Sequence, residues 1–235
     1  MRILQITVRA DIGGGPEHLY QLMANLPQDV RCHVACPMDA PYWERFGQLA
    51  QVEERIEIPH RALSRSHIAA LARHIRREGI GIIHSHGKGA GLYGRALAML
   101  TGRPAIHTFH GLHIGTYGPV KKALYFGLER ALGQMTTAGI SVSESECRDI
   151  AAARLLPARK LTIIENGVHI PDASTLGTLE GSEAPGAKRG PSTISRVSDM
   201  RTARSRGAGT AARAPGTGPK LKIVAVSRYN DQKNA

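Results

Sequence analysis

The fold of this chain is constrained most by a repeated alternation of short apolar runs with longer amphipathic ones. Short runs rich in Ile, Val, Leu and Ala predict buried strands at 3–8, 29–36, 52–58, 80–84, 104–109, 135–142 and 161–165. The segments between them predict helices, and this alternation is typical of parallel βαβ units with right-handed crossovers. We therefore expect residues 1–171 to form one α/β domain, a Rossmann-like doubly wound parallel sheet.

The composition changes after this domain. Residues 172–219 are rich in Gly, Ala, Ser, Thr, Pro and Arg and contain no aromatic residue. Such a segment buries too little apolar surface to offset its ordering entropy, so we expect a disordered linker that trypsin cuts before the core. Residues 220–235 begin with the apolar run LKIVAV, which predicts the first strand of a second, truncated domain.

The charge of the chain bounds its partners. A net charge of +12 leaves nucleic acid, anionic lipid and phosphate-bearing ligands open. Aromatic residues make up only 4% of the chain, which disfavours a stacking platform for RNA, so we expect no nucleic-acid partner and keep a non-enzymatic basic binding domain as an alternative. No apolar run approaches the roughly 20 residues that span a bilayer. Because Asp11 comes too early for a signal peptide, we expect a cytoplasmic protein.

Histidines and glycines gather where two of the predicted strands end. Residues 82–91 read IIHSHGKGAG, and residues 106–111 read IHTFHG. In an open parallel sheet, ligands bind beyond the carboxyl ends of the strands, so we expect these two ends to form one shared site. His110, beside Gly111, is the favoured catalytic residue, and His84 is interpreted as a hydrogen-bonded core residue.

A glycine loop follows the first predicted strand. Residues 11–17, DIGGGPE, predict a turn that leads into a helix and presents backbone N–H groups to a ligand. Gly13 and Gly15 fit the first two glycines of G-x-G-x-x-G, but His18 stands at the third, and no ribose-binding acid follows Cys36. A dinucleotide-binding oxidoreductase is therefore an alternative with weaker support.

A metal site is a further alternative. His84 and His86 lie two residues apart, hence on one face of a strand, and His107, His110 and His113 are near in sequence. Imidazoles at such spacing bind zinc. Because no cysteine or carboxylate cluster accompanies them, we favour a sugar site and expect no metal cofactor.

Two features near the later helices carry further predictions. Ser143 and Glu146 fit a capping box at the start of the helix 144–154. In the helix 119–132, one row of side chains at i, i+4 spacing should face the core and a second row should face outward. The inner row is Val120, Leu124, Leu128 and Leu132, and the outer row is Lys122, Phe126 and Arg130. A basic outer row suits peripheral contact with the inner face of a membrane, and an ordinary solvated face with one exposed Phe is the alternative.

Several motifs, in this order, resemble retaining glycosyltransferase family 4. They are GGGPEHLYQL, IIHSHG, HTFHG, SVSES and IIENGVHIP, followed by IVAVSRYNDQKN, which resembles the opening of the family's donor domain. The resemblance covers residues 1–171 and part of 220–235. It implies a GT-B fold and the transfer of a sugar from a nucleotide sugar to a glycan or lipid-linked acceptor hydroxyl, with retention and without a metal.

The resemblance also implies roles for single residues. His110 would be catalytic, Arg228 and Lys233 would offset the charge of the donor diphosphate, and the remaining residues would bind the acceptor or sugar. These remaining residues are Gly14, Gly15, His86, Gly111, Glu144 and Asn166. The family's carboxylate pair has no counterpart here, and Asn234 follows Lys233 where the family usually has glycine. We therefore expect an acceptor-side domain that is inactive alone.

Overall fold

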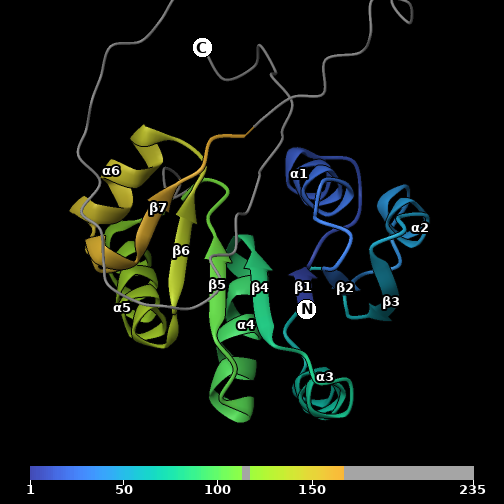
Figure 1. Ribbon diagram of the computed structural model, residues 1–235. Helices are drawn as coiled ribbons and strands as arrows, with labels where there is room; N and C mark the ends of the chain where they lie inside the picture. The colour runs from blue at the N-terminus through green and yellow to red at the C-terminus, as the bar shows by residue number, and fades with distance from the viewer. Residues whose placement is uncertain (113–116, 167–235) are drawn as a thin grey trace, which may run out of the picture. The chain divides into compact units, whose positions relative to one another are not determined.

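A computed structural model of the chain describes residues 1–112 and 117–166, which form a parallel sheet flanked by helices (Figure 1). The sheet has seven strands in the order β3-β2-β1-β4-β5-β6-β7, and every neighbouring pair is parallel. The strands are β1 (Arg2–Thr7), β2 (Arg31–Cys36), β3 (Val52–Glu57), β4 (Ile82–His86), β5 (Ala105–Thr108), β6 (Ala138–Ser141) and β7 (Leu161–Ile163). This arrangement confirms the expected Rossmann-like α/β fold.

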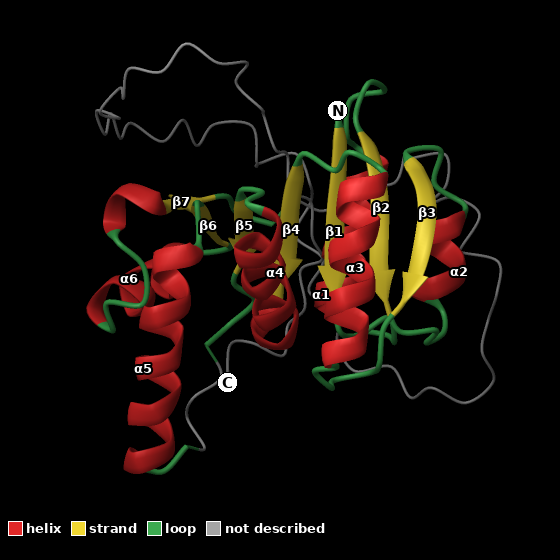
Figure 2. Cartoon of the chain, turned by 90° about the horizontal axis from the view of Figure 1, so that it is seen from below, coloured by secondary structure: helices red, strands yellow, loops and turns green. Residues whose placement is uncertain are grey.

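The helices cover both faces of this sheet. They are α1 (Gly14–Ala24), α2 (Tyr42–Gly47), α3 (Arg65–Arg77), α4 (Gly87–Thr101), α5 (Pro119–Met135) and α6 (Glu144–Ala152), with a 3₁₀ turn η1 (Ala158–Lys160) before β7. Figures 1 and 2 show α1 and α2 on one face and α3 and α4 on the other. β3 and β4 lie on opposite sides of β1 and β2. The connection between β3 and β4 therefore carries the chain from one face of the sheet to the other.

Local sequence sets several helix ends. The Ser64 hydroxyl accepts a hydrogen bond from the backbone N–H of His67 and so caps α3. Gly79, at φ +63°, follows the end of α3, and Gly102, at φ +69°, ends α4. Glycine adopts this left-handed conformation without the steric cost that a Cβ brings.

Two apolar clusters hold the elements together. The larger one joins side chains of β1 and β4 to α3 and α4, with Ile6, Ile83, Leu71 and Tyr93 among its members. The smaller one lies beyond β5 and consists of Phe109, Leu112, Ile150, Leu155 and Leu156. At the carboxyl ends of β4 and β5, the side chains are polar and belong to neither cluster.

The prediction for the faces of α5 is wrong. Val120, Leu124 and Leu128 are 72%, 71% and 49% exposed, whereas Glu129 and Gly133 on another face are buried. Polar and steric contacts explain this orientation. The Glu129 carboxylate lies 3.3 Å from Arg95 of α4, and a side chain in place of Gly133 would meet the backbone oxygen of Leu155.

The other row of α5 differs from the prediction at one position, Phe126. Phe126 packs against the smaller apolar cluster, and Arg130 Nε donates a hydrogen bond to the backbone oxygen of Ala153 at 3.0 Å. Lys122 and Arg130 keep the exposure that was expected of this row, whereas Phe126 is half-buried. The first turns of α5 extend past the carboxyl ends of the strands (Figure 2).

Other predictions fall on parts of the chain that the structure leaves undescribed. The expected linker at 172–219, the expected second domain at 220–235 and His113 all lie outside the described residues. Among the described helices, none has both the length and the apolar character needed to cross a bilayer.

Candidate functional site

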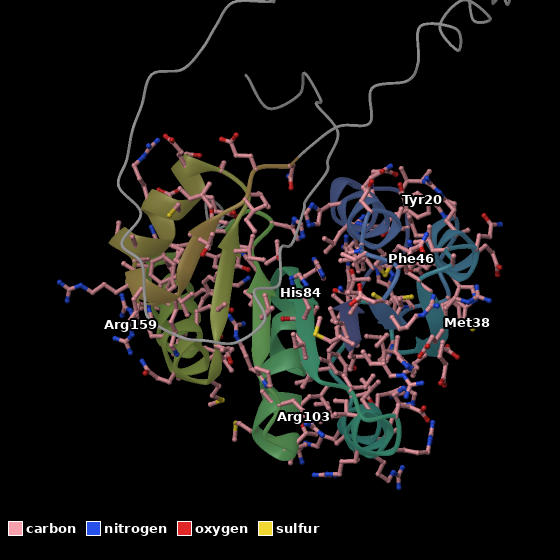
Figure 3. The ribbon with its side chains drawn as sticks, in the orientation of Figure 1. Tyr20, Met38, Phe46, His84, Arg103 and Arg159 are labelled. Carbon is pink, nitrogen blue, oxygen red and sulfur yellow. The ribbon has the colours of Figure 1, made fainter. Side chains whose placement is uncertain are left out.

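The site is built on the register of the central strands. His86 at the end of β4 lies opposite Thr7 of β1 and Thr108 of β5. His84, two residues earlier, points to the same face of the sheet because side chains alternate along a strand. Figure 3 labels His84 on β4, in the middle of the sheet. The sheet therefore directs two adjacent imidazoles toward the face that α1 covers.

Three histidines from separate elements meet at this end of the sheet. His18 comes from α1, His86 ends β4, and His110 follows β5. The ring centroids of His18 and His110 are 4.8 Å apart, and each lies 5.8 Å from the centroid of His86. One ring nitrogen from each of the three lies within 4.8 Å of the other two. This histidine cluster, His18–His86–His110, is the candidate functional site.

The neighbouring histidines are held in other contacts. His84 Nε2 lies 2.8 Å from the hydroxyl of Thr108, and the His84 side chain is fully enclosed. This confirms its interpretation as a hydrogen-bonded core residue. His107 points to the opposite face, toward α4, where its Nδ1 lies 3.0 Å from the hydroxyl of Ser85. His107 is thus separated from the histidine cluster by the sheet.

Burial keeps these imidazoles neutral. It lowers the pKa of His18 to about 4, an effect that a hydrogen bond with Asn166 opposes. Burial, with a contribution from His18, lowers the pKa of His84 to about 3. The pKa of His86 is well below its usual value because of burial and the neighbouring histidines. Near neutral pH these rings therefore act as hydrogen-bond donors and acceptors or as metal ligands, not as cations.

A buried carboxylate fixes the loop that carries His110. Glu146 accepts hydrogen bonds from the backbone N–H of Gly111 at 2.5 Å, the backbone N–H of Val142 at 3.0 Å and the hydroxyl of Ser141 at 3.1 Å. Gly111 adopts φ +87°, a conformation that favours glycine. The end of β5 is thereby tied to the start of α6.

Only half of the expected capping box at α6 forms. The Ser143 hydroxyl accepts a hydrogen bond from the backbone N–H of Glu146, as predicted. The Glu146 carboxylate does not complete the motif, because it is engaged with the Gly111 loop and the end of β6.

The structure brings several predicted site residues together. His86 and His110 belong to the histidine cluster, and Asn166 lies beside His18. Gly14 and Gly15 form the first turn of α1, and Gly14 lies one turn before His18 on the same face of the helix.

Other predicted residues lie elsewhere. Glu144 is exposed and pairs with Arg148 on α6 at 3.6 Å, two residues from the carboxylate that reaches the Gly111 loop. Arg228 and Lys233 lie outside the described residues.

Three residues of the site were not predicted: His18, Gln5 and Glu146. His18 was noted only as the residue that breaks the dinucleotide pattern, although its position four residues after Gly14 places it on the buried face of α1. Gln5 on β1 accepts a hydrogen bond with its Oε1 from His86 Nε2, 2.9 Å away. A polar residue within an otherwise apolar first strand is a signal that could have identified Gln5.

Comparison with known proteins places this site in context. The sequence model described as Glycosyltransferase Family 4 matches residues 12–170. No curated protein sequence matches the chain. Among solved structures, that of Anabaena Alr3699/HepE in complex with UDP and glucose is similar, with a TM-score of 0.61, 16% identity and coverage of 77% of this chain and 49% of that chain.

Two further solved structures have a similar fold. A glycosyltransferase from Rickettsia africae gives a TM-score of 0.54 at 14% identity, covering 76% of this chain and 48% of that one. The lipopolysaccharide outer core galactosyltransferase WaaB gives 0.51 at 12% identity, covering 73% and 47%. The chain thus spans about half the length of the structures that it resembles.

Proposed function

This chain belongs to glycosyltransferase family 4, and from that membership we propose that it forms the acceptor-side half of a GT-B enzyme. The enzyme transfers a hexose from a nucleotide sugar to an acceptor hydroxyl and retains the anomeric configuration. The donor is a UDP-sugar, a proposal supported by the UDP and UDP-glucose bound to the structurally similar HepE.

The histidine cluster is the observation that carries this proposal. It lies at the carboxyl ends of β4 and β5, next to the first turn of α1, where open parallel sheets bind ligands. His110 is the most exposed of the three rings, so it contacts the transferred sugar, with His86 and His18 behind it. A neutral imidazole can both donate and accept a hydrogen bond, which suits a sugar hydroxyl.

The charge on the donor diphosphate is assigned to cations of the protein. Arg228 and Lys233 offset it in this proposal, because fixed cations stabilise the charge that builds on a leaving group. The transfer reaction itself is therefore proposed to need no metal ion. Gly14, Gly15, Gly111 and Asn166 complete the acceptor side around the histidine cluster.

The test is a transfer assay on His110→Ala, with His60→Ala as the matched control. His60 is a half-exposed histidine that pairs with Asp39. The chain is joined to the donor-side domain of a two-domain family member, and the chain alone is run beside it. Both are incubated with radiolabelled UDP-sugars and a membrane extract as the source of acceptor. We expect His110→Ala to lower incorporation about 10²- to 10⁴-fold and His60→Ala to leave it unchanged. Normal turnover by His110→Ala would remove this residue from the site.

The acceptor is proposed to be linked to a lipid, on the basis of α5. Its exposed side chains Val120, Leu124 and Leu128 lie on a segment that also carries Lys121 and Lys122 and no acidic residue before Glu129. Apolar side chains with adjacent lysines suit an anionic membrane surface.

Vesicle flotation tests this membrane contact. Binding to anionic vesicles should fall in Leu124→Ser and persist in Leu63→Ser, which changes an exposed leucine outside α5. Equal binding of the unchanged protein to neutral and anionic vesicles would contradict the proposal.

A further inference from the structure

We propose that His33, Glu54 and His74 bind a structural zinc ion that holds α3 against the edge of the sheet. His33 lies on β2, Glu54 on β3 and His74 on α3, so one ion joins three elements. α3 covers the face of the sheet opposite to α1 (Figure 2), and the sheet therefore separates this ion from the histidine cluster. The inference involves no residue of the candidate functional site and does not depend on the proposed transfer.

A shift in strand register brings two carboxylates to His33. Cys32 of β2 is paired with Val52 of β3, but the next residue, His33, is paired with Glu54, so that Glu53 is an extra residue. Consecutive side chains of a regular strand point to opposite faces. Here both glutamates approach the same imidazole, Glu53 at 3.3 Å from His33 Nε2 and Glu54 at 3.7 Å from His33 Nδ1. Irregularities of this kind re-aim side chains at functional sites.

The distances between the three side chains are close to those of a zinc site. Ligand atoms bound to zinc at about 2.0–2.1 Å in tetrahedral geometry lie about 3.3 Å apart. His33 Nδ1 lies 2.9 Å from His74 Nε2 and 3.7 Å from Glu54 Oε2. One ligand atom from each of the three residues lies within 4.8 Å of the other two. Both measured separations differ from the ideal by about 0.4 Å, so small side-chain rotations place all three around one ion.

The surrounding hydrogen bonds prepare His33 for metal binding. The Arg77 guanidinium, which can only donate, faces His74 Nδ1 at 3.0 Å. His74 therefore carries its proton on Nε2 and donates it to His33 Nδ1. The proton of His33 is then on Nε2, which is buried, has no hydrogen-bond partner among the described residues and points to Glu53 Oε2. Metal-bound histidines direct their second N–H at a carboxylate in this way, so Glu53 is the positioning residue.

Binding requires one rearrangement, at His74. Its proton moves from Nε2 to Nδ1, which frees Nε2 for the ion, and Arg77 leaves the ring. The Arg77 side chain is 64% exposed and also pairs with Glu78, so it turns into solvent without losing its partner. The Glu54 side chain is 45% exposed and gives the ion a path from solvent.

The chemistry of the donor set favours zinc over harder cations. Two imidazoles with one carboxylate are a ligand set that zinc uses, whereas Mg²⁺ and Ca²⁺ prefer oxygen ligands alone. The side chains of His33 and His74 are 3% and 7% exposed, so the nitrogen ligands are already held in place by the packing of α3.

The experiment is a titration of the full chain, first freed of metal with a chelator, with Zn²⁺ by calorimetry. Co²⁺ in place of Zn²⁺ gives the visible spectrum of the bound ion, and Mg²⁺ tests for simple attraction to acidic side chains. Thermal unfolding with and without Zn²⁺ measures whether the ion stabilises the fold. Circular dichroism establishes that each variant folds, and the exposed Glu54 gives a variant, Glu54→Gln, that alters the packing least.

We expect one Zn²⁺ per chain, a tetrahedral Co²⁺ spectrum and a midpoint of thermal unfolding that rises with zinc. Glu54→Gln should weaken zinc binding at least about 10-fold, and His74→Gln by at least as much. Arg77→Ala should strengthen it a few-fold, because a cation next to a ligand ring opposes the ion. The controls Glu57→Gln, an exposed acid of β3, and His110→Ala should leave zinc binding unchanged.

Four outcomes would overturn the proposal. These are no zinc binding by the unchanged protein, unchanged affinity in folded Glu54→Gln and His74→Gln, loss of binding in His110→Ala, and displacement of zinc by equal Mg²⁺. A gain of affinity in Arg77→Ala supports the site specifically, since a merely structural hydrogen bond at His74 predicts none. Because no readout contains a sugar, a failure here is separate from a failure of the proposed transfer.

Discussion

At the level of single residues, the site depends on one carboxylate that no motif marked as functional. Glu146 is 7% exposed and accepts two backbone N–H bonds and one hydroxyl bond. These bonds fix the backbone next to His110. Glu144, two residues before Glu146, lies in the SVSES motif and points to solvent, where it pairs with Arg148. The motif therefore identified the right segment and the wrong carboxylate for this contact.

Replacing Glu146 should destabilise the fold. In Glu146→Gln, an NH₂ group takes the place of one acceptor oxygen and faces the N–H of either Gly111 or Val142, which bond to different oxygens. We expect the free energy of unfolding to fall by about 1–3 kcal/mol, measured by urea denaturation. Glu144→Gln is the matched control and should change it by less than about 0.5 kcal/mol. Equal effects of the two variants would show that the Glu146 bonds contribute nothing specific.

The buried histidines should make the protein sensitive to acid. The pKa of His18 is about 4 in the folded chain and 6.5 when unperturbed, so between these pH values the unfolded chain binds more protons. Stability is therefore complete above pH 6.5 and falls as the pH drops toward 4, on the order of 3 kcal/mol for His18 alone.

Urea denaturation at about pH 7 and about pH 5 measures the slope of the free energy of unfolding against pH. His18→Leu should flatten it, because the titrating group is gone, and His60→Leu should not. A slope that is the same in His18→Leu and in the unchanged protein would mean that other groups carry the acid sensitivity.

At the level of elements, the alternation of apolar and amphipathic runs was enough to predict all seven strands of the sheet. Boundaries were less predictable. The strand expected at 80–84 is β4 at Ile82–His86, because the N–H of Ile80 bonds to the oxygen of Ile75 and closes the end of α3. Periodicity cannot separate such a buried turn from the start of a strand.

The faces of α5 show a second limit of sequence patterns. Its row of large apolar residues was the natural candidate for the core, yet the helix buries Glu129 and Gly133. The partners that decide this orientation, Arg95 of α4 and the backbone of Leu155, lie far away in the sequence. For the same reason His18 was missed, since its neighbours in the histidine cluster come from β4 and the end of β5.

Two glycines of α5 should respond in opposite ways to alanine. A Cβ at Gly133 would collide with the backbone oxygen of Leu155, so Gly133→Ala should lower the free energy of unfolding by about 1–3 kcal/mol. A Cβ at Gly127 would meet nothing within 4 Å, so Gly127→Ala should raise it by about 0.5–1 kcal/mol. Thermal and urea unfolding of the two variants test this pair, and a stabilising Gly133→Ala would contradict the close packing of α5.

At the level of the whole described domain, a buried ion pair joins α4 to α5. Arg95 and Glu129 are 1% and 3% exposed, and Arg95 Nε also donates to the hydroxyl of Thr136 at 2.9 Å. Burial lowers the pKa of Arg95 and raises the pKa of Glu129, while the opposite charge of each partner acts against that shift. The pair thus fixes α5 against α4 at a considerable cost of desolvation.

Breaking this pair should cost more than replacing it. Glu129→Ala leaves an unpaired buried guanidinium and should lower the free energy of unfolding by about 3–5 kcal/mol. The double variant Arg95→Met, Glu129→Leu should lose much less, because no charge remains buried. Arg148→Ala, which removes an exposed partner, is the control. A double variant as unstable as Glu129→Ala would show that the ion pair itself, and not the unpaired charge, carries the effect.

The order of the described strands, within residues 1–112 and 117–166, leaves the sheet with two unlike edges. β3, at one edge, reads VEERIE and carries four charged side chains, and charged edges resist pairing with the strands of other molecules. β7, at the other edge, reads LTI, and Ile163 is 43% exposed. If this domain self-associates through its sheet, the strand that pairs with another molecule should therefore be β7 and not β3. Ile163→Lys is the substitution that would suppress this pairing.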